Sequence, residues 1–225
     1  MPGRRSLGVA LRVYIPAVMK SGEPTSEREA KEWIAAAIQG VDPFWAIYAE
    51  TERHRLEHAC EAYASADGAL LGVLARAVAA RRMLEIGTAL GYTAAWLAHG
   101  APKGRVDTIE ADPSHAEAAK AALRSVGLAD RVRIHVGRSP GALGQLEPGY
   151  DLIFYDAHIL TPEELVAFRT LLRPGGLLVT SNLFLGRYDA SMPGLEQGAA
   201  VRRQLLDPSR WFTTFADLKA LSVRP

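Results

Sequence analysis

The order of strand-like and helix-like runs after residue 80 constrains the fold most. The strand-like runs read RMLEIG, RVDTIEAD, RVRIHVG, YDLIFYDA and GLLVTSN, and a helix-like run follows each of the first four. Strands that alternate with helices indicate βαβ units and a mostly parallel sheet. The last run, RWFTTFADLKALSVRP, holds two strand-like segments with no helix between them. We therefore predict an α/β fold in which an antiparallel C-terminal hairpin completes a seven-stranded sheet.

The chain before residue 80 has a different pattern. Three helical runs lie between about Thr25 and Ala80, and no strand-like run precedes Met83. The first run opens with Thr25 or Ser26 as a capping residue and has acidic residues in its first turn. We expect residues 1–64 to form an N-terminal helical segment that packs on the core, and residues 65–225 to form the ligand-binding domain.

Composition excludes several classes of protein. The 225 residues carry a net charge of +1, so a basic surface for nucleic acid or for an anionic membrane is not expected. Cys60 is the only cysteine, which excludes an internal disulfide and fits a reducing compartment. Arg12 and Pro16 interrupt the apolar N-terminal stretch, and no apolar run reaches the ~20 residues of a membrane span. These features predict a cytoplasmic protein without a signal peptide.

Polar or small residues stand at the end of every predicted parallel strand. Because ligands bind outside the carboxyl ends of the strands in an open parallel sheet, these positions predict one crevice for a polar ligand. In chain order they are Glu85, Glu110, the triplet Gly137-Arg138-Ser139, the run Asp156-Ala157-His158 and the pair Ser181-Asn182.

The turn after the first strand is the most informative of these ends. Gly87 and Gly91 allow a close approach to the backbone, but Ala89 breaks the G-x-G-x-x-G pattern of dinucleotide-binding turns, and no phosphate-binding Gly-Lys-Ser/Thr follows. Glu85 at the strand end repels a phosphate and favours a cation. Glu110 is placed to bind the two hydroxyls of a ribose. A cationic ligand with a ribose and no phosphate is S-adenosylmethionine.

Four stretches of the chain also resemble a known family. LEIGTALGYTAAWLA, IEADP, YDLIFYDA and LLRPGGLLVTSN are similar to the small S-adenosylmethionine-dependent O-methyltransferases typified by catechol and caffeoyl-CoA O-methyltransferases. The resemblance covers roughly Ser65 to Arg224. It implies a Rossmann-like methyltransferase domain that uses S-adenosylmethionine as cofactor and forms a homodimer. The acceptor it implies is a hydroxyl of a small molecule, with aromatic compounds among the candidates.

The resemblance also implies roles for individual residues. Glu85, Gly87 and Thr93 match the positions that hold the methionine end of the cofactor, and Glu110 matches the ribose clamp. Asp156 matches the carboxylate shared by the cofactor amine and a catalytic metal. The full set implied to bind the cofactor is Glu85, Gly87, Thr88, Gly91, Tyr92, Thr93, Glu110, Ala111, Gly137, Arg138, Ser139 and Asp156.

The pattern departs from the family at the metal site and at the base. Asp156 and Asn182 match two metal ligands, but Ser181 replaces the expected carboxylate, which weakens a site for Mg²⁺. Ile159 stands where the family commonly has a lysine that is suggested as the base. We therefore favour a metal-free reaction in which His158 takes the hydroxyl proton and Asp156 orients the substrate or the imidazole. A loop histidine without a task is the open alternative for His158.

Other functions compatible with the sequence remain open. The run HRLEH, His54 to His58, matches the H-x-x-E-H zinc-protease pattern, but its charged flanks favour a solvated helix face. Methylation of a tRNA hydroxyl, a nicotinamide oxidoreductase, and a cofactor-binding protein without turnover are the competing functions. The acceptor is not predicted, because its specificity is expected to reside in the N-terminal helices and in the loop from Leu185 to Gly198.

Overall fold

The computed structural model describes residues 24–184, 195–216 and 218–225. The apolar N-terminal stretch and residues 185–194 of the loop expected to set acceptor specificity lie outside the described residues. The chain divides into two compact units, Met1–Trp45 and Ala46–Pro225. The boundary after residue 64 stays a prediction.

The first unit contains one described helix, α1 (Glu27–Val41). It begins after Ser26, whose Oγ accepts the backbone N–H of Glu29 at 3.2 Å. Glu27 and Glu29 then place negative charge at the positive end of the helix dipole. Ser26 is therefore the capping residue of the two that the sequence offered.

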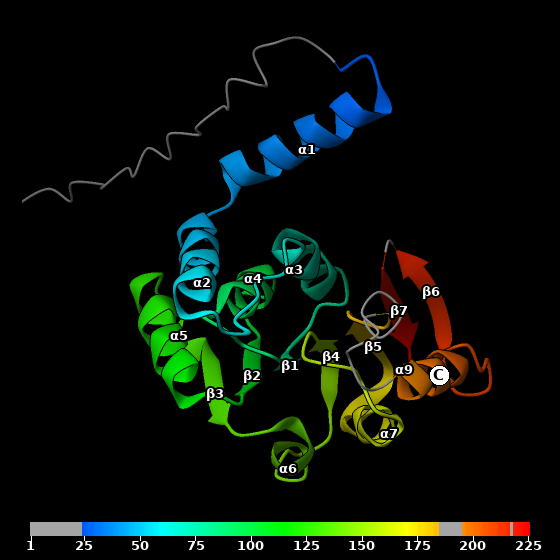
Figure 1. Ribbon diagram of the computed structural model, residues 1–225. Helices are drawn as coiled ribbons and strands as arrows, with labels where there is room; N and C mark the ends of the chain where they lie inside the picture. The colour runs from blue at the N-terminus through cyan, green and yellow to red at the C-terminus, as the bar shows by residue number, and fades with distance from the viewer. Residues whose placement is uncertain (1–23, 185–194, 217) are drawn as a thin grey trace, which may run out of the picture. The chain divides into compact units, whose positions relative to one another are not determined.

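The second unit is built around a seven-stranded sheet with the order β3-β2-β1-β4-β5-β7-β6 (Figure 1). Its first five strands in the chain pair in parallel, and β7 runs antiparallel to both β5 and β6. The α/β fold with a C-terminal hairpin is thus confirmed. The strands are β1 (Arg82–Ile86), β2 (Arg105–Glu110), β3 (Val132–Val136), β4 (Tyr150–Tyr155), β5 (Leu172–Thr180), β6 (Phe212–Ala216) and β7 (Lys219–Val223).

Helices cover both faces of the sheet (Figure 1). One face carries α3 (Gly68–Ala77), α4 (Tyr92–Gly100) and α5 (Pro113–Ser125), and the other carries α6 (Ser139–Leu143), α7 (Pro162–Leu171) and α9 (Leu195–Leu205). The helix α2 (Trp45–His58) precedes them. No helix in the described ranges is both long and apolar enough to cross a membrane.

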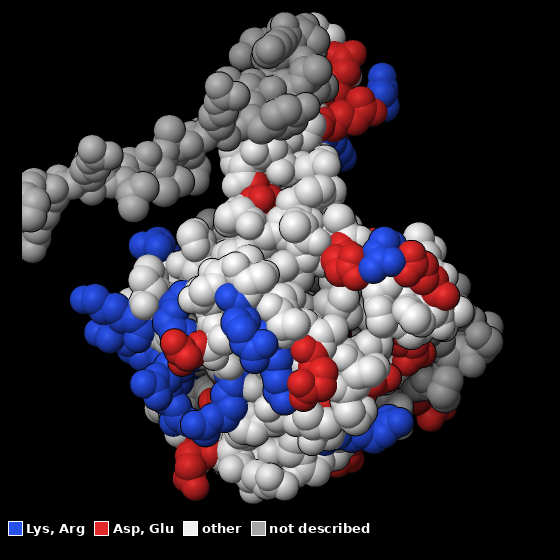
Figure 2. Space-filling view, turned by 90° about the vertical axis from the view of Figure 1, so that its left-hand side faces the viewer, with Lys and Arg blue, Asp and Glu red and all other residues white. Residues whose placement is uncertain are grey.

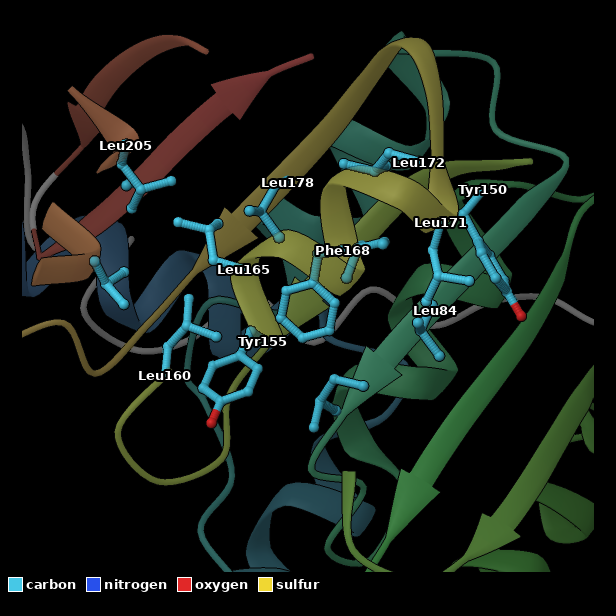
Figure 3. Close-up of a cluster of buried hydrophobic side chains, with 14 of the residues drawn as sticks. Leu84, Tyr150, Tyr155, Leu160, Leu165, Phe168, Leu171, Leu172, Leu178 and Leu205 are labelled. Atoms are coloured by element: carbon cyan, nitrogen blue, oxygen red, sulfur yellow. The ribbon is translucent and has the colours of Figure 1, made fainter. Parts of the chain in front are cut away.

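The core on the α7 side explains why the strands after residue 80 are so apolar (Figure 3). Leu84 of β1 and Tyr155 of β4 point into one buried cluster with Leu165 and Phe168 of α7, and the rings of Tyr155 and Phe168 lie 5.7 Å apart. A strand covered by helices on both faces must be apolar on both sides. The run LIFY of β4 meets this requirement, because all four residues are buried.

The helices α3 and α4 approach each other through glycines. A Cβ atom on Gly68 would lie 2.2 Å from a ring atom of Trp96, and one on Gly100 would lie 2.1 Å from the carbonyl oxygen of Gly72. The second contact is with backbone, which cannot rotate away. Gly72 and Gly100 therefore allow the two backbones to touch, and this contact holds α3 against α4, which packs on β2.

Two segments differ from their predicted extent. The second helical run of the sequence, DPFWAIYAETERHRLEHACEAYA, extends to Ala64, but α2 ends at His58 because Ala59 adopts a left-handed conformation with φ of 49°. The predicted loop was expected to continue to Gly198, but α9 already begins at Leu195. No glycine or proline marks the end of α2 in the sequence, whereas Pro193 and Gly194 directly precede α9.

Candidate active site

Glu85 lies next to the carboxyl end of β1 and is completely buried. Thr93, at the start of α4, donates a hydrogen bond to Oε1 of Glu85, and Thr108 of β2 donates to Oε2 at 2.6 Å. The Oγ1 atoms of Thr88 and Thr108 lie 2.6 Å apart and extend this network. Parallel pairing sets Glu85 opposite Thr108. Hydroxyl groups, rather than a cation, thus hold the carboxyl group.

The electrostatic surroundings of Glu85 favour a positively charged ligand. Burial raises the pKa of Glu85 from 4.5 to about 8, and the hydrogen bonds from Thr108 and Thr93 offset this only in part. The negative charges of Asp156 and Glu110 raise this pKa further. Three carboxyl groups therefore interact at the ends of the neighbouring strands β2, β1 and β4. A cation bound among them would stabilise the ionised form of Glu85.

Glu110, at the end of β2, holds the loop that follows β1. Its Oε2 accepts the backbone N–H groups of Thr88 at 3.2 Å and Ala89 at 2.8 Å, and its Oε1 accepts that of Asp112 at 2.9 Å. Nδ1 of His115 in α5 lies 3.7 Å from the same Oε1. The carboxylate expected to bind a ribose is thus fixed beside the loop expected to hold the rest of the cofactor.

Each glycine of this loop is required for a different physical reason. A Cβ atom on Gly87, where φ is 94°, would lie 2.5 Å from the carbonyl oxygen of Asp156. Gly87 therefore allows the end of β1 to pack against the end of β4. Gly91 also has φ of 94° and is the N-cap of α4. Ala89, between them, adopts φ of 46°, a conformation that disfavours every residue except glycine.

The loop after β3 reaches the same edge of the sheet. The N–H of Gly137 donates to the carbonyl oxygen of Glu110 at 2.8 Å, and Arg138 is the N-cap of α6. Ser139 donates its hydroxyl to Oε1 of Glu164, a buried residue of α7. The hydroxyl of Ser139 therefore already has a protein partner. Ala111 is exposed directly after β2.

Asp156 follows β4 and is half-buried. Burial raises the pKa of Asp156 from 3.8 to about 6, while the charge of Lys219 lowers it and that of Asp67 raises it. Asn182 donates Nδ2 to Oδ1 of Asp156 at 3.2 Å. The hydroxyl of Ser181 also lowers this pKa, although its Oγ makes no hydrogen bond of standard geometry with the described residues.

The groups around Asp156 do not suit Mg²⁺. Octahedral Mg²⁺ binds carboxylate and carbonyl oxygens, whereas Ser181 offers a neutral hydroxyl and Asn182 directs its amide nitrogen at Asp156. Lys219 of β7 adds an ammonium group, which is in ion-pair contact with Asp67. The ammonium of Lys219 already provides positive charge near Asp156, so it would repel a divalent cation bound to that carboxylate.

The side chain of His158 contacts Glu61 rather than Asp156. Its Nε2 is 3.3 Å from Oε2 of Glu61, and the two side chains are 69% and 73% exposed. No hydrogen bond or ion pair joins His158 to Asp156 within the described ranges. If an acidic residue orients this imidazole, the structure makes that residue Glu61. The role of His158 as a base stays a prediction.

The remaining residue of the predicted set, Tyr92, is buried at the start of α4. Its ring lies edge-on to the ring of Tyr48 in α2, with 5.2 Å between the centroids. The side chain therefore packs α4 against α2. Thr93, the next residue, turns its hydroxyl to Glu85.

Three residues near the site were not predicted from the sequence. Thr108 joins Glu85 to Thr88, and only the register of β1 against β2 reveals it. The charges of Lys219 and Asp67 act on Asp156, although these two residues lie near opposite ends of the second unit's sequence. The signal for Lys219 was that it is the single charged residue of the strand-like run LKALSV.

A cavity of about 600 Å³ lies elsewhere, between α6 and α7. Apolar residues such as Leu143, Leu146 and Leu171 line much of it, together with Thr161 and Glu164. Neither Glu85 nor Asp156 borders this cavity. The cavity is therefore separate from the candidate site at the strand ends, where the carboxyl groups gather.

The sheet order and the acidic residues at its strand ends define the class of Rossmann-like methyltransferases. A model of a methyltransferase domain matches residues 84–182. O-Methyltransferase TomG of Streptomyces achromogenes, involved in tomaymycin synthesis and solved with S-adenosylmethionine, superimposes with a TM-score of 0.70 at 30% identity, and the match covers 88% of this chain and 99% of that one. The chain belongs to the O-methyltransferase family.

Two curated relatives carry a more specific name. The chain is 43% identical over 131 residues to a catechol O-methyltransferase of Mycobacterium tuberculosis, a match that covers 56% of this chain and 58% of the relative. It is 38% identical over 122 residues to a catechol O-methyltransferase of Niastella koreensis, covering 52% of this chain and 55% of the relative. The chain thus spans somewhat more than half the length of these relatives.

Proposed function

We propose that this protein transfers the methyl group of S-adenosylmethionine to a hydroxyl of a small aromatic molecule such as a catechol. One observation carries the proposal, the convergence of Glu85, Glu110 and Asp156 at the carboxyl ends of three neighbouring strands. Such a site favours a cationic nucleoside without phosphate. The TomG structure with S-adenosylmethionine and the names of the two catechol O-methyltransferases support the same choice.

The residues at the strand ends fit this cofactor. Glu110, fixed by the loop amides, offers carboxylate oxygens to the ribose hydroxyls. Gly87 keeps the loop close to β4, Thr93 joins α4 to Glu85, and Asp156 offers a carboxylate to the cofactor ammonium. The loop of Gly137, Arg138 and Ser139 lies on the adenine side. When bound, the cofactor supplies a methyl group activated by its sulfonium.

The reaction then needs alignment and removal of one proton. Displacement at a sulfonium methyl is in line, so the protein gains most by holding the acceptor hydroxyl in place. We assign proton removal to His158, oriented by Glu61, and the positioning of the acceptor to Asp156. The ammonium of Lys219 stabilises the negative charge that develops on the acceptor oxygen, and no divalent metal takes part.

The proposal also covers the choice of acceptor, the location and the oligomeric state. We assign acceptor selection to the N-terminal segment of residues 1–64 and to the loop around residues 185–198, and we expect a cytoplasmic homodimer. The tRNA alternative has less support, because acidic side chains lie among the Lys and Arg residues on the face drawn in Figure 2. The oxidoreductase alternative conflicts with Ala89, which breaks the G-x-G-x-x-G pattern of pyrophosphate-binding turns, and with the acidic residues gathered beside this turn.

Methyl transfer from labelled S-adenosylmethionine tests this function. The purified protein is expected to label at least one member of a catechol panel, and EDTA is expected to leave the rate within about two-fold. A rate abolished by EDTA and restored by Mg²⁺ would contradict the metal-free mechanism. Cofactor binding with no labelled product from any hydroxyl acceptor would favour a binding protein without turnover.

The same assay tests His158. His158→Ala is expected to lower kcat at least about ten-fold near neutral pH, because the hydroxyl proton loses its acceptor. The affinity for S-adenosylmethionine, measured by calorimetry, should not change. His99→Ala, at an exposed histidine on α4, is the control. Equal turnover of His158→Ala and wild type would remove His158 from the mechanism.

A further inference from the structure

A second group of chemically active side chains lies outside the strand-end site. His54 of α2, Cys60 after α2 and His115 of α5 each offer one ligand atom, and these atoms all lie within 4.8 Å of one another. His115 is buried, whereas His54 and Cys60 are half-buried. The group is therefore shielded from bulk water on one side and reachable from the other.

The backbone places Cys60 in this group. A helix continued beyond His58 would carry residue 60 to another face than His54, because six residues correspond to about 600° of rotation. Instead Ala59 adopts φ of 49°, and the N–H of Cys60 donates to the carbonyl oxygen of Arg55 at 3.3 Å. A left-handed alanine costs on the order of 1 kcal/mol. The chain thus adopts an unfavourable conformation at the residue before Cys60.

The side chains of the H-x-x-E-H run do not form the contacts of a zinc-protease site. Glu57, which would be the catalytic glutamate, forms an exposed ion pair with Arg53. The ring of His54 lies between two imidazoles, with 4.4 Å between its centroid and that of His58 and 5.2 Å between its centroid and that of His115. The ligand atoms that converge with that of His54 nevertheless belong to Cys60 and to His115 of a distant helix, a set that the run alone does not predict.

We propose that His54, Cys60 and His115 bind a divalent transition-metal cation of the zinc type. One thiolate and two imidazoles are a ligand set for zinc, and three protein ligands leave a fourth tetrahedral position for solvent. Zinc bonds of ~2.0–2.3 Å require ligand atoms roughly 3.5 Å apart. The side chains must therefore close by about 1 Å, which rotation about their χ angles supplies.

The site is coupled to the cofactor site through His115. Its Nδ1 lies 3.7 Å from Oε1 of Glu110, so His115 can face the carboxylate with one nitrogen and a metal with the other. A metal-bound histidine commonly directs its second nitrogen to a carboxylate. The other oxygen of Glu110 holds the loop amides of Thr88 and Ala89. Under the proposed function, the metal therefore stabilises the ribose-binding carboxylate in position.

Titration of untagged, chelator-treated protein with Co²⁺ and Zn²⁺, without any cofactor, tests the site. We expect one ion per chain and a cobalt–thiolate charge-transfer band, which only Cys60 can produce because it is the only cysteine. Cys60→Ser is expected to abolish the band and weaken Zn²⁺ binding at least about 100-fold, and His54→Gln to weaken it at least about ten-fold. His99→Gln, outside the group, is expected to bind as wild type does.

Two results would overturn the proposal. Absence of stoichiometric binding would remove the site, and binding that is unchanged in both Cys60→Ser and His54→Gln would place the ion elsewhere. The coupling is tested by calorimetry of S-adenosylmethionine with and without Zn²⁺, where a several-fold tighter affinity is expected and equal affinities would contradict it. Zinc binding without any affinity for S-adenosylmethionine would refute the proposed function and leave the metal site standing.

Discussion

Replacing Glu85 with glutamine is expected to weaken S-adenosylmethionine binding at least about 30-fold and to stabilise the cofactor-free protein. Loss of a charge-assisted interaction costs about 2–3 kcal/mol, which corresponds to this change in affinity. Glutamine keeps the size of the side chain and can still bond to Thr93 and Thr108. Calorimetry and thermal melting of the variant measure the two effects.

The stability effect has a definite pH dependence. The folded-state pKa of Glu85, about 8, lies above its ordinary 4.5, so the folded state binds the extra proton. Stability of the wild type is therefore lost as the pH rises from about 4.5 through 8, and Glu85→Gln avoids this loss. At pH 8.5 we expect the variant to melt roughly 5 °C higher than wild type, and at pH 5 almost equally.

The same reasoning predicts how affinity varies with pH. The positive cofactor binds better to ionised Glu85, so its affinity should rise strongly between pH 6 and 8 in the wild type. In Glu85→Gln it should rise only about two-fold, because Asp156, with a pKa of about 6, completes its ionisation in this range. Glu117→Gln, at an exposed position of α5, controls for the loss of a surface charge. Unchanged affinity in Glu85→Gln, or a lower melting temperature at pH 8.5, would contradict the role given to Glu85.

Gly100→Ala is expected to cause the largest loss of stability. The new Cβ atom would lie 2.1 Å from the carbonyl oxygen of Gly72 and 2.6 Å from its carbonyl carbon, so α3 and α4 must separate. Overpacking against backbone costs at least about 3 kcal/mol, which lowers the melting temperature by roughly 10 °C. Thermal melting of the cofactor-free protein measures this change.

Gly141→Ala is the matched control for Gly100→Ala. Gly141 is also helical, in α6, but a Cβ atom there would have nothing within 4 Å. This variant is expected to melt at or slightly above the wild-type temperature, because alanine favours a helix. Equal melting temperatures for the two variants would show that α3 and α4 are not held by backbone contact at Gly100.

The fold followed from the sequence because its signals are local. The run LIFY predicts a strand buried on both faces, and the closing run predicts a hairpin without reference to any other part of the chain. The end of α2 was missed, because a left-handed alanine at Ala59 has no signature of its own. The start of α9 lay inside a segment rich in glycine and proline, which masked its helical character.

The site was predicted in part. Residues at strand ends were identified because parallel strands bring their carboxyl ends together. Glu110 indeed binds the loop that follows the strand of Glu85, and its charge raises the pKa of Glu85. The partners of these residues depend on register and on distant segments. Thr108, Lys219 and the pairing of His158 with Glu61 therefore required the structure.

Calorimetric titration of the purified protein with S-adenosylmethionine and, separately, with NAD⁺ tests the central claim most directly. If carboxyl groups at three strand ends select a cationic nucleoside without phosphate, S-adenosylmethionine binds at least about 100-fold more tightly than NAD⁺. Binding of NAD⁺ with equal or greater affinity would contradict the account, because the same carboxyl groups should repel its pyrophosphate.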